Sequence, residues 1–379
     1  MNKKILFIKI GNFSQINNQV LDVIKANFKE CEVEVLDVFE LYSKFNFKRL
    51  INFIYLAKEY GIDFLKRKKS RYDWKTYEIV TSYAFKQIKK QINKKVNLNP
   101  EEYLFTFQTQ SLFDGSTQNI KHYVYTDSTV LANRLYPLIE MKKILKSKKW
   151  MKLERTIYSN ATINFTFSIN QCKSIIEDYQ IDSDKVKCIF AGCQFENITI
   201  EKKDYSRKNI LFIGVNWERK GGEILLEEFK KVKMVLPDAT LTIIGCNPQI
   251  NENGVSILGK IHPNQLKEYF MQATVYCMPS ILEPFGMVYI EAMRYKLPIV
   301  ALNIGAIPDF VENNINGFIH DFQDNNNINQ SLIKLLTYND LCEKFGEESY
   351  MRTKKVYNWT NVGIQMRENI QSTLNTIIK

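Results

Sequence analysis

Short apolar runs, each followed by a segment with helical periodicity, recur along this chain and constrain its fold more than any other feature. Residues 5–10 are expected to form a buried strand, and residues 20–28 follow with apolar side chains at helical spacing. Further strands are expected at 33–38, 103–107, 122–126 and 161–167. From residue 209 onward the alternation is regular, with strands expected at 209–214, 239–245, 274–278 and 298–302. Strands that alternate with helices form βαβ units, so the pattern predicts an α/β fold with mainly parallel sheets.

The length of the chain favours two domains rather than one. Its 379 residues exceed what a single hydrophobic core usually serves. A polar, charged segment at 198–208 separates two stretches with ordered patterns. We therefore predict two Rossmann-like, doubly wound domains at 1–200 and 206–358. Such domains place their ligand sites where strands end and helices begin, so two facing domains would share one deep cleft.

Positive charge is concentrated in the first predicted domain. The chain carries 52 Lys+Arg against 41 Asp+Glu, a formal net charge of +11, and residues 1–200 hold 32 of the basic and 21 of the acidic residues. Two basic clusters dominate, at 66–71 and 142–152, and both have aromatic residues beside them. Such clusters suit a membrane surface with anionic lipid, or they form a solvated lysine-rich face. We expect no nucleic acid partner.

Cysteine usage and hydropathy favour a cytoplasmic protein, with peripheral contact at the inner face of the membrane as a further expectation. The seven cysteines form no CxxC pair and no Cys/His cluster with metal-ligand spacing, which favours reduced thiols and no metal site. No stretch approaches the roughly 20 apolar residues of a membrane span. The apolar run at 5–10 is interrupted by Lys9, so we interpret it as a strand rather than a signal peptide.

The strongest functional pattern follows the strand expected at 274–278 and opens a helix. Glu283 lies in the loop, and Glu291 lies eight residues later, about two turns into the helix. A helix start offers unpaired N–H groups that bind phosphate well. Two carboxylates on either side of a phosphate site match a nucleotide diphosphate sugar, with the sugar at Glu283 and the ribose at Glu291. The backbone N–H groups between them belong to Phe285, Gly286, Met287 and Val288.

Two further patterns follow neighbouring strands. After the strand at 209–214, Gly214 forms a turn, and Arg219 and Lys220 directly precede two glycines that open a helix. These cations can neutralise a diphosphate as it leaves, and the glycines allow close approach of the backbone. After the strand at 298–302, Gly305 forms a turn before a helix start, where it would flank the base or a phosphate.

Taken together, these patterns resemble the family 4 glycosyltransferases, which have the GT-B fold. The string from Pro279 to Ala292 matches the family's context PS-x-x-E-x-FG-x-x-x-x-E-A. By this resemblance Lys220 contacts the diphosphate. Many members have an arginine directly after the first glycine, where this chain has Val215, and we expect Arg219 to supply that charge. Gly305 lies in a segment that resembles the family's glycine-rich loop.

The N-terminal half resembles a subset of the same family. Asp127 lies at a strand end facing the predicted cleft, where the resemblance implies a contact with the acceptor or the transferred sugar. A helix N-cap is the alternative role for Asp127. Gly11 and Asn12 follow the first strand and fit the loop that lies over the diphosphate, and Ser168 is either a cleft residue or an N-cap. The remaining residues that carry this resemblance are Trp150, Glu154, Arg155 and Tyr158.

The resemblance implies a retaining, metal-independent hexosyltransferase without a cofactor. It would move a sugar from a nucleotide diphosphate sugar to a glycan or lipid-linked acceptor in the synthesis of cell-surface polysaccharide or glycoconjugates. The first domain would hold the acceptor, the second the donor, and a final helix at 359–379 would pack back on the first domain. Two alternatives remain open, a non-catalytic GT-B module that binds a glycan or a partner, and a GT-B sugar-nucleotide 2-epimerase.

Overall fold

The chain divides into two compact units. The computed structural model describes residues 3–11, 16–43, 46–61, 78–135, 148–193, 198–200 and 202–375. Unit 1 comprises the described residues of Met1–Leu135, Ile139–Phe190 and Trp359–Lys379, and unit 2 those of Ala191–Asn358. The division falls at residue 190, ahead of the polar segment at 198–208, so residues 198–200 already belong to unit 2.

Unit 1 is built on a parallel sheet with the strand order β2-β1-β3-β4-β5-β6. The chain moves outward from β1 to β2 and then continues on the other side of β1, so the order reverses between β1 and β3. The strands are β1 (Lys4–Lys9), β2 (Glu32–Asp37), β3 (Tyr103–Thr109), β4 (Lys121–Thr126), β5 (Ile163–Thr166) and β6 (Val186–Cys188). Its helices are α1 (Ile16–Asn27), α2 (Val38–Ser43), α3 (Asn46–Tyr60), α5 (Ser82–Val96), α7 (Lys148–Asn160), α8 (Ile169–Lys173) and α15 (Trp359–Asn375).

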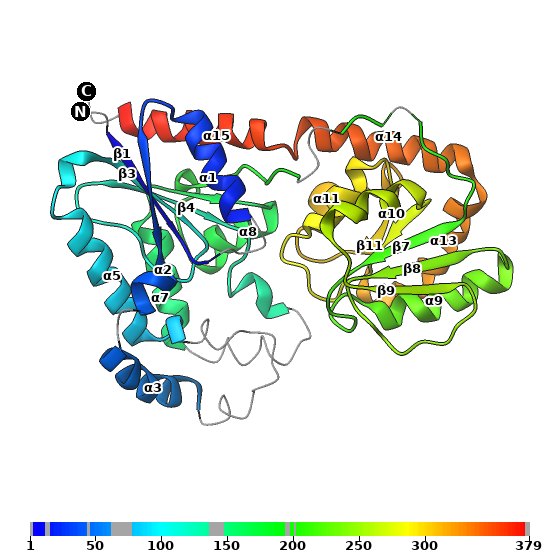
Figure 1. Cartoon of the computed structure of the whole chain (residues 1–379), viewed down its shortest axis with the longest axis horizontal. Helices are drawn as coiled ribbons and strands as arrows, with labels where there is room; N and C mark the ends of the chain where they lie inside the picture. The colour runs from blue at the N-terminus through cyan, green and yellow to red at the C-terminus, as the bar shows by residue number, and fades with distance from the viewer. Residues whose placement is uncertain are drawn as a thin grey trace. The chain divides into compact units, whose positions relative to one another are not determined.

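The alternation of side chains along the strands gives unit 1 two packed layers. Leu6 and Ile8 join the apolar faces of α5 and α7 in one cluster. On the other face aromatic rings dominate, and Phe7 stacks with Phe107 at a centroid distance of 6.0 Å. Burial of each such side chain stabilises the fold by about 1.5–3 kcal/mol. Helices therefore cover both faces of the sheet (Figure 1).

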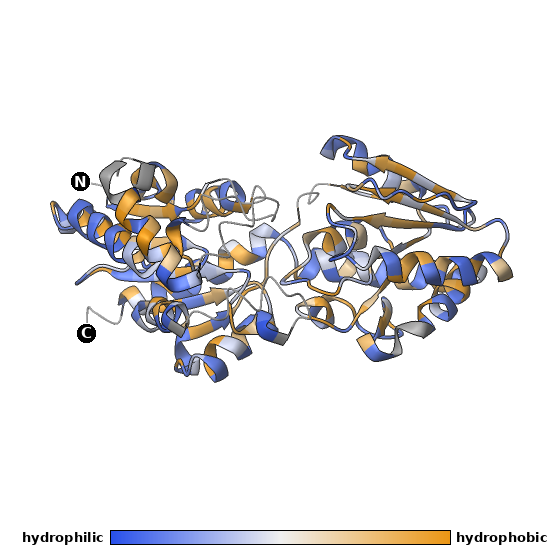
Figure 2. Cartoon of the chain, turned by 90° about the horizontal axis from the view of Figure 1, so that it is seen from below, coloured by the Kyte–Doolittle hydropathy of each residue, from blue (hydrophilic) through white to orange (hydrophobic). Residues whose placement is uncertain are grey.

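Unit 2 repeats the same architecture with the order β12-β11-β10-β7-β8-β9, again all parallel. Helix α9 packs on α13, and α11 packs on α14. The strands of both units are largely hydrophobic, whereas the helices carry hydrophilic sides (Figure 2). The strands are β7 (Asn209–Ile213), β8 (Thr240–Ile244), β9 (Val255–Gly259), β10 (Val275–Cys277), β11 (Ile299–Leu302) and β12 (Gly317–His320). The helices are α9 (Gly222–Val235), α10 (Leu266–Gln272), α11 (Met287–Arg294), α12 (Ile307–Phe310), α13 (Ile328–Thr337) and α14 (Asn339–Lys355).

The strands that the sequence patterns did not predict are β6, β9 and β12, and all three lie at sheet edges. An edge strand has a neighbouring strand on one side only, so more of its surface is exposed and its sequence lacks a continuous apolar run. In β9, for example, exposed residues alternate with half-buried ones. Helices α2, α13 and α14 were also not predicted. The segments at 62–77 and 136–147, which include most of the two basic clusters, lie outside the described residues.

Two helices of unit 1 differ in where they place their large apolar side chains. Leu50, Phe53 and Ile54 of α3 are exposed. Trp150 of α7, which lies beside a basic cluster in the sequence, is instead buried and packs edge-on against Phe85. Trp150 therefore belongs to the core and cannot reach a membrane. Among the described helices, none has the length and apolar character needed to cross a bilayer.

We predict that Gly346→Ala destabilises unit 2, although alanine is the better helix former. A Cβ at Gly346 of α14 would lie 2.3 Å from the Lys296 carbonyl oxygen and 2.3 Å from the Tyr205 hydroxyl. Overpacking of this kind costs about 1–3 kcal/mol, which exceeds the gain in helix propensity of about 1 kcal/mol. Thermal unfolding measures the effect, with Glu348→Ala at an exposed position of α14 as the control. A higher melting temperature for Gly346→Ala would show that α14 does not pack this closely.

Candidate functional site

Three of the sequence patterns lie at the ends of adjacent strands in unit 2. Strand β10 pairs with β7 on one side and with β11 on the other. After β7 the chain continues to β8 and β9, and it then returns to place β10 on the opposite side of β7. The order of the strands therefore reverses between β7 and β10. In open α/β sheets, ligands bind outside the carboxyl ends of the strands at such a reversal.

The loop after β7 is compact because its own side chains and glycines bend it. Asn216 accepts a hydrogen bond from the Arg219 N–H at 2.6 Å through its side-chain oxygen, and its carbonyl accepts one from the Lys220 N–H at 3.0 Å. Gly221 has φ +72°, and a Cβ there would lie 1.8 Å from the Pro279 carbonyl oxygen. Only glycine allows the loop after β7 to approach the loop after β10 this closely.

A buried ion pair joins these two loops. Lys220 from the loop after β7 forms a salt bridge with Glu283 from the loop after β10. Lys220 is 7% exposed and Glu283 is 5% exposed. The Ser280 hydroxyl donates to the same carboxylate at 3.3 Å. Because an unpaired charge would be strongly unfavourable in such a place, each of the two groups depends on the other.

Helix α11 begins directly after this pair. Gly286 precedes its first turn with φ +101°, and a Cβ there would lie 2.8 Å from the Tyr289 ring and 3.1 Å from Glu283. Met287 and Val288 form the half-buried first turn, so their backbone groups lie near the Glu283 loop. The Phe285 side chain packs against Phe310 at 6.1 Å, so the ring belongs to the core, and only its backbone can serve a ligand.

Glu291 lies further along α11 and is 6% exposed. Burial raises the pKa of its carboxyl to about 7. A carboxyl group in this state can accept or donate a hydrogen bond, which suits the hydroxyls of a ribose. Strongly shifted carboxyl groups cluster at functional sites, although structural burial alone also produces them.

The remaining predicted residues of unit 2 lie at the ends of β7 and β11. Gly214 directly follows β7, and a Cβ there would lie 2.9 Å from the aliphatic part of Lys220, so its lack of a side chain leaves room for the lysine. Gly305 has φ +53° and follows β11. Arg219 directs its guanidinium to the Leu282 carbonyl oxygen at 2.9 Å. Unit 2 thus brings Gly214, Arg219, Lys220, Glu283, Gly286, Glu291 and Gly305 to the carboxyl ends of adjacent strands or the helices that follow them.

In unit 1 the predicted residues lie at corresponding strand ends. Gly11 follows β1 with φ +52°, and its N–H donates to Asp37 at 3.2 Å. Asp127 follows β4 directly. Ser168 caps α8 and accepts a hydrogen bond from the Gln171 N–H at 3.2 Å, which decides between its two predicted roles in favour of the cap. Asn12 lies outside the described residues.

Glu154 of α7 received no role from the sequence, yet it ties together the loops after β3 and β4. Its buried carboxylate accepts hydrogen bonds from the Val130 N–H at 3.1 Å, from the Ser111 hydroxyl at 3.2 Å and from the Tyr179 hydroxyl. Burial raises the pKa of Glu154 to about 7, although these donors oppose the shift. The sequence did contain a sign of this role. Glu154 lies four residues after Trp150 and therefore on the same, buried face of the helix, where an acid needs hydrogen-bond donors.

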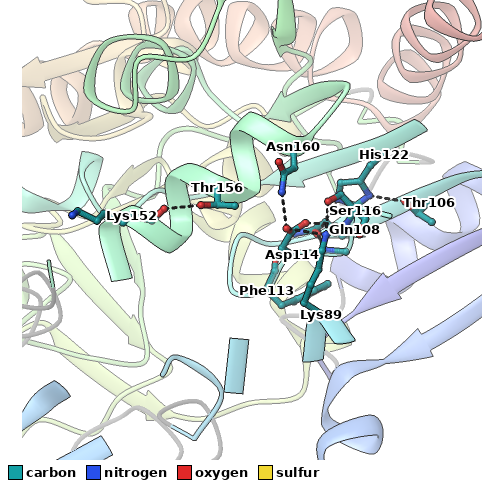
Figure 3. Close-up of polar contacts among 11 residues, drawn as sticks. Lys89, Thr106, Gln108, Phe113, Asp114, Ser116, His122, Lys152, Thr156 and Asn160 are labelled. Atoms are coloured by element: carbon teal, nitrogen blue, oxygen red, sulfur yellow. Dashed lines mark hydrogen bonds and ion pairs between the residues drawn. The ribbon is translucent and has the colours of Figure 1, made fainter. Parts of the chain in front are cut away.

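A second buried polar network, shown in Figure 3, holds the loop that follows β3. Gln108 donates to the carbonyls of Gln110 and Phe113 at 2.8 and 2.9 Å, so its oxygen faces Nε2 of His122 at 3.0 Å. Nε2 therefore carries the proton, and Nδ1 accepts from the Thr106 hydroxyl at 2.7 Å. The same loop is fastened by the ion pair of Lys89 and Asp114 at 2.9 Å.

We predict that His122 stays neutral down to about pH 4. Burial lowers the pKa of His122 to about 4, and Lys89 adds to this effect while Asp114 opposes it. Because the unfolded chain binds this proton at about pH 6.5, stability is complete above that pH and falls between pH 6.5 and 4 by about 3 kcal/mol. NMR of the imidazole resonance measures the titration, with His122→Gln to assign it. Titration near pH 6.5 would contradict the buried network.

Known proteins resemble this chain in the sequence of unit 2 and in the fold. Residues 194–352, most of unit 2, match the family model described as Glycosyl transferases group 1. The structure of sucrose-phosphate synthase from Thermosynechococcus elongatus matches over 99% of this chain and 100% of its own, with a TM-score of 0.68 and 15% identity. The fold is the GT-B fold of glycosyltransferases. The α/β class predicted from the sequence is thereby confirmed.

Two further proteins resemble the chain. The GT-B fold recurs in HepE of Anabaena, solved in complex with UDP and glucose, which covers 98% of this chain and 100% of its own with a TM-score of 0.67 and 14% identity. A 41.2 kDa protein of unassigned function in the cps region of Klebsiella pneumoniae is 24% identical over 245 residues, 58% of this chain and 67% of its own length. Several other curated relatives are matched over about half of their length.

Proposed function

We propose that this protein is a glycosyltransferase that takes a nucleotide diphosphate sugar as donor and transfers a hexose-type sugar to a glycan or lipid-linked acceptor. The observation that carries the proposal is the buried pair of Lys220 and Glu283 at the strand-order reversal of unit 2, next to the start of α11. The UDP and glucose bound by HepE support a nucleotide-sugar donor. Synthesis of cell-surface polysaccharide or glycoconjugates is the role that we propose for this transfer.

In this proposal the donor replaces the internal ion pair. Lys220 exchanges the carboxylate of Glu283 for an oxygen of the diphosphate, and Glu283 then accepts hydrogen bonds from hydroxyls of the sugar. The N–H groups at the start of α11 face the phosphates, and Glu291 holds the ribose. Because this place is shielded from water, one cation there interacts with the diphosphate far more strongly than it would at the surface.

The transfer is proposed to retain the configuration of the sugar and to need no metal ion. The bond between the anomeric carbon and the diphosphate oxygen breaks, and a bond to the acceptor oxygen forms on the same face. The acceptor proton passes to the departing phosphate. Lys220 and the helix amides stabilise the negative charge that grows on the diphosphate, which is the work a metal does in other transferases.

Unit 1 is proposed to serve the acceptor. Asp127 lies directly after β4, where a carboxylate would bind acceptor hydroxyls, and Gly11 lies after β1, at the same edge of the sheet. The backbone around Asp127 is held by Glu154 and by Thr129, whose hydroxyl accepts from the Ala132 N–H at 3.0 Å. A fixed loop suits the recognition of a defined sugar.

We also propose a cytoplasmic protein that binds the inner face of the membrane through unit 1. In the described part of the basic clusters, Lys149 and Lys152 are exposed at the start of α7. The exposed apolar residues of α3 add a surface that could enter the headgroup region. A lipid-linked acceptor would explain why a transferase needs such contact.

Substitution of Lys220 tests the donor site. We expect Lys220→Met to weaken UDP binding by about ten- to a hundredfold, because a hydrogen bond to a charged group contributes about 1.5–3 kcal/mol. Glu283→Gln is expected to reduce transfer from UDP-glucose more than it reduces UDP binding, since Glu283 faces the sugar. Isothermal titration calorimetry and release of UDP measure the two effects, with GDP and ADP and their glucose conjugates as further probes.

Lys203→Met is the matched control for this experiment. Lys203 is also a buried lysine of unit 2, but it donates to the Phe270 carbonyl at 2.6 Å, close to where β10 begins rather than where it ends. Equal loss of nucleotide binding in both variants would point to a general destabilisation and against the site. Binding without transfer would favour the non-catalytic module, and conversion of the donor without an acceptor would favour the epimerase.

Charge reversal tests the membrane contact. The double variant Lys149→Glu/Lys152→Glu is expected to lower binding to vesicles of phosphatidylcholine and phosphatidylglycerol by about tenfold or more, because each lysine near such a surface contributes about 1 kcal/mol. Co-sedimentation measures the bound fraction. Lys260→Glu/Lys267→Glu, at exposed positions of unit 2, is the control. Unchanged binding of the first variant would exclude α7 from the contact.

A further inference from the structure

The loops after β7 and β10 are joined at three consecutive residues. The Arg219 carbonyl accepts a hydrogen bond from the Ile281 N–H at 3.0 Å. Lys220 pairs with Glu283. Gly221 lies against the Pro279 carbonyl without room for a side chain. Residues 219–221 therefore contact residues 279–283, and Lys220 of the ion pair lies between the other two contact residues of its loop.

Arg219 contributes both its backbone and its side chain to this interface. Besides the bond from Ile281, its guanidinium donates to the Leu282 carbonyl at 2.9 Å. Its own N–H is fixed by the Asn216 side chain at 2.6 Å. Arg219 thus binds the two residues that directly precede Glu283, while Asn216 holds Arg219 in the loop after β7.

We propose that Arg219 is a positioning residue that holds Glu283 against Lys220 by fastening the loop after β10 to the loop after β7. The sequence suggested that the charge of Arg219 neutralises the diphosphate. In this proposal its guanidinium instead binds a backbone carbonyl of the protein. The proposal rests on the proposed function only in so far as Lys220 and Glu283 bind the donor. The contact between the loops exists without any ligand.

The physical reason is the geometry that a buried ion pair requires. Two charges removed from water are stable only when they stay within hydrogen-bonding distance and their remaining bonds are satisfied. Glu283 lies in the loop after β10. Contacts of Ile281 and Leu282 with Arg219 anchor the part of this loop directly before Glu283. A guanidinium is suited to this task, because it keeps its charge and holds a planar, directed donor. Loss of the anchor would let the carboxylate move away from the lysine.

A footprint of lysine reactivity tests the proposal without a ligand. The full chain is acetylated with N-hydroxysuccinimidyl acetate, and the modification of each lysine is followed by mass spectrometry. We expect Arg219→Met to raise the acetylation rate of Lys220 by about five- to tenfold, as for the loss of one ordinary hydrogen bond. Asn216→Ala, which removes no charge, is expected to act in the same direction.

Two controls separate positioning from unfolding. Arg207→Met removes another arginine of unit 2, which pairs with the exposed Asp204 at 3.5 Å, and it should leave the acetylation rate of Lys220 unchanged. Lys203 is also buried in unit 2, and its acetylation should stay constant in every variant. An unchanged rate at Lys220 in both Arg219→Met and Asn216→Ala would overturn the proposal, and so would equal acceleration at Lys203.

Nucleotide binding then tells positioning apart from direct contact. If Arg219 acts through Lys220, Arg219→Met weakens UDP binding in the parent chain and has no further effect in a Lys220→Met background. If Arg219 binds the diphosphate itself, the losses of UDP affinity in Arg219→Met and Lys220→Met multiply in the double variant, and Asn216→Ala leaves UDP binding unchanged. That result would overturn the proposal. Failure of the parent chain to bind UDP, GDP or ADP would refute the proposed function, and the footprint would still decide the role of Arg219.

Discussion

The ion pair of Lys220 and Glu283 is the interaction on which the rest of unit 2 depends. Two charged side chains can be buried here only because each neutralises the other, and they can meet only because β7 and β10 are adjacent and parallel. The strand order places β10 beside β7, so the loops that follow these two strands meet although they are more than 60 residues apart in the chain. The fold therefore holds two charges in a place shielded from water, which suits the binding of a diphosphate that we propose.

The sequence placed the candidate residues of unit 2 at strand ends and helix starts, where the structure also has them, because each pattern is local. Glu283, Gly286 and Glu291 lie on one strand–loop–helix segment, and Lys220 lies on another, so strand and helix periodicity was enough to place them at strand ends. The partners of these residues could not be predicted in the same way. The bond from Arg219 to the Leu282 carbonyl and the contact of Gly221 with Pro279 depend on two distant loops meeting.

The features that sequence reasoning missed share a physical cause. Edge strands such as β9 carry a weak apolar signal because only part of their surface is buried. Glu154 and His122 are polar residues inside a core, and their hydrogen bonds come from several elements at once. Trp150 was expected to lie on a surface because it stands next to a lysine cluster in the sequence. Its ring instead faces inward and packs against Phe85. Composition and periodicity describe one segment at a time, whereas these roles are set by neighbours in space.

The return of α15 to unit 1 has a consequence for synthesis on the ribosome. Val362, Met366 and Ile370 are buried, and α15 packs on α1 near the start of the chain. The 331 residues between these two helices, all of unit 2 included, take about 15–65 seconds to translate at usual elongation rates. During that interval the apolar side of α1 stays uncovered in the nascent chain. Unit 1 must therefore tolerate an unfinished surface, or be shielded by a chaperone, until its last helix emerges.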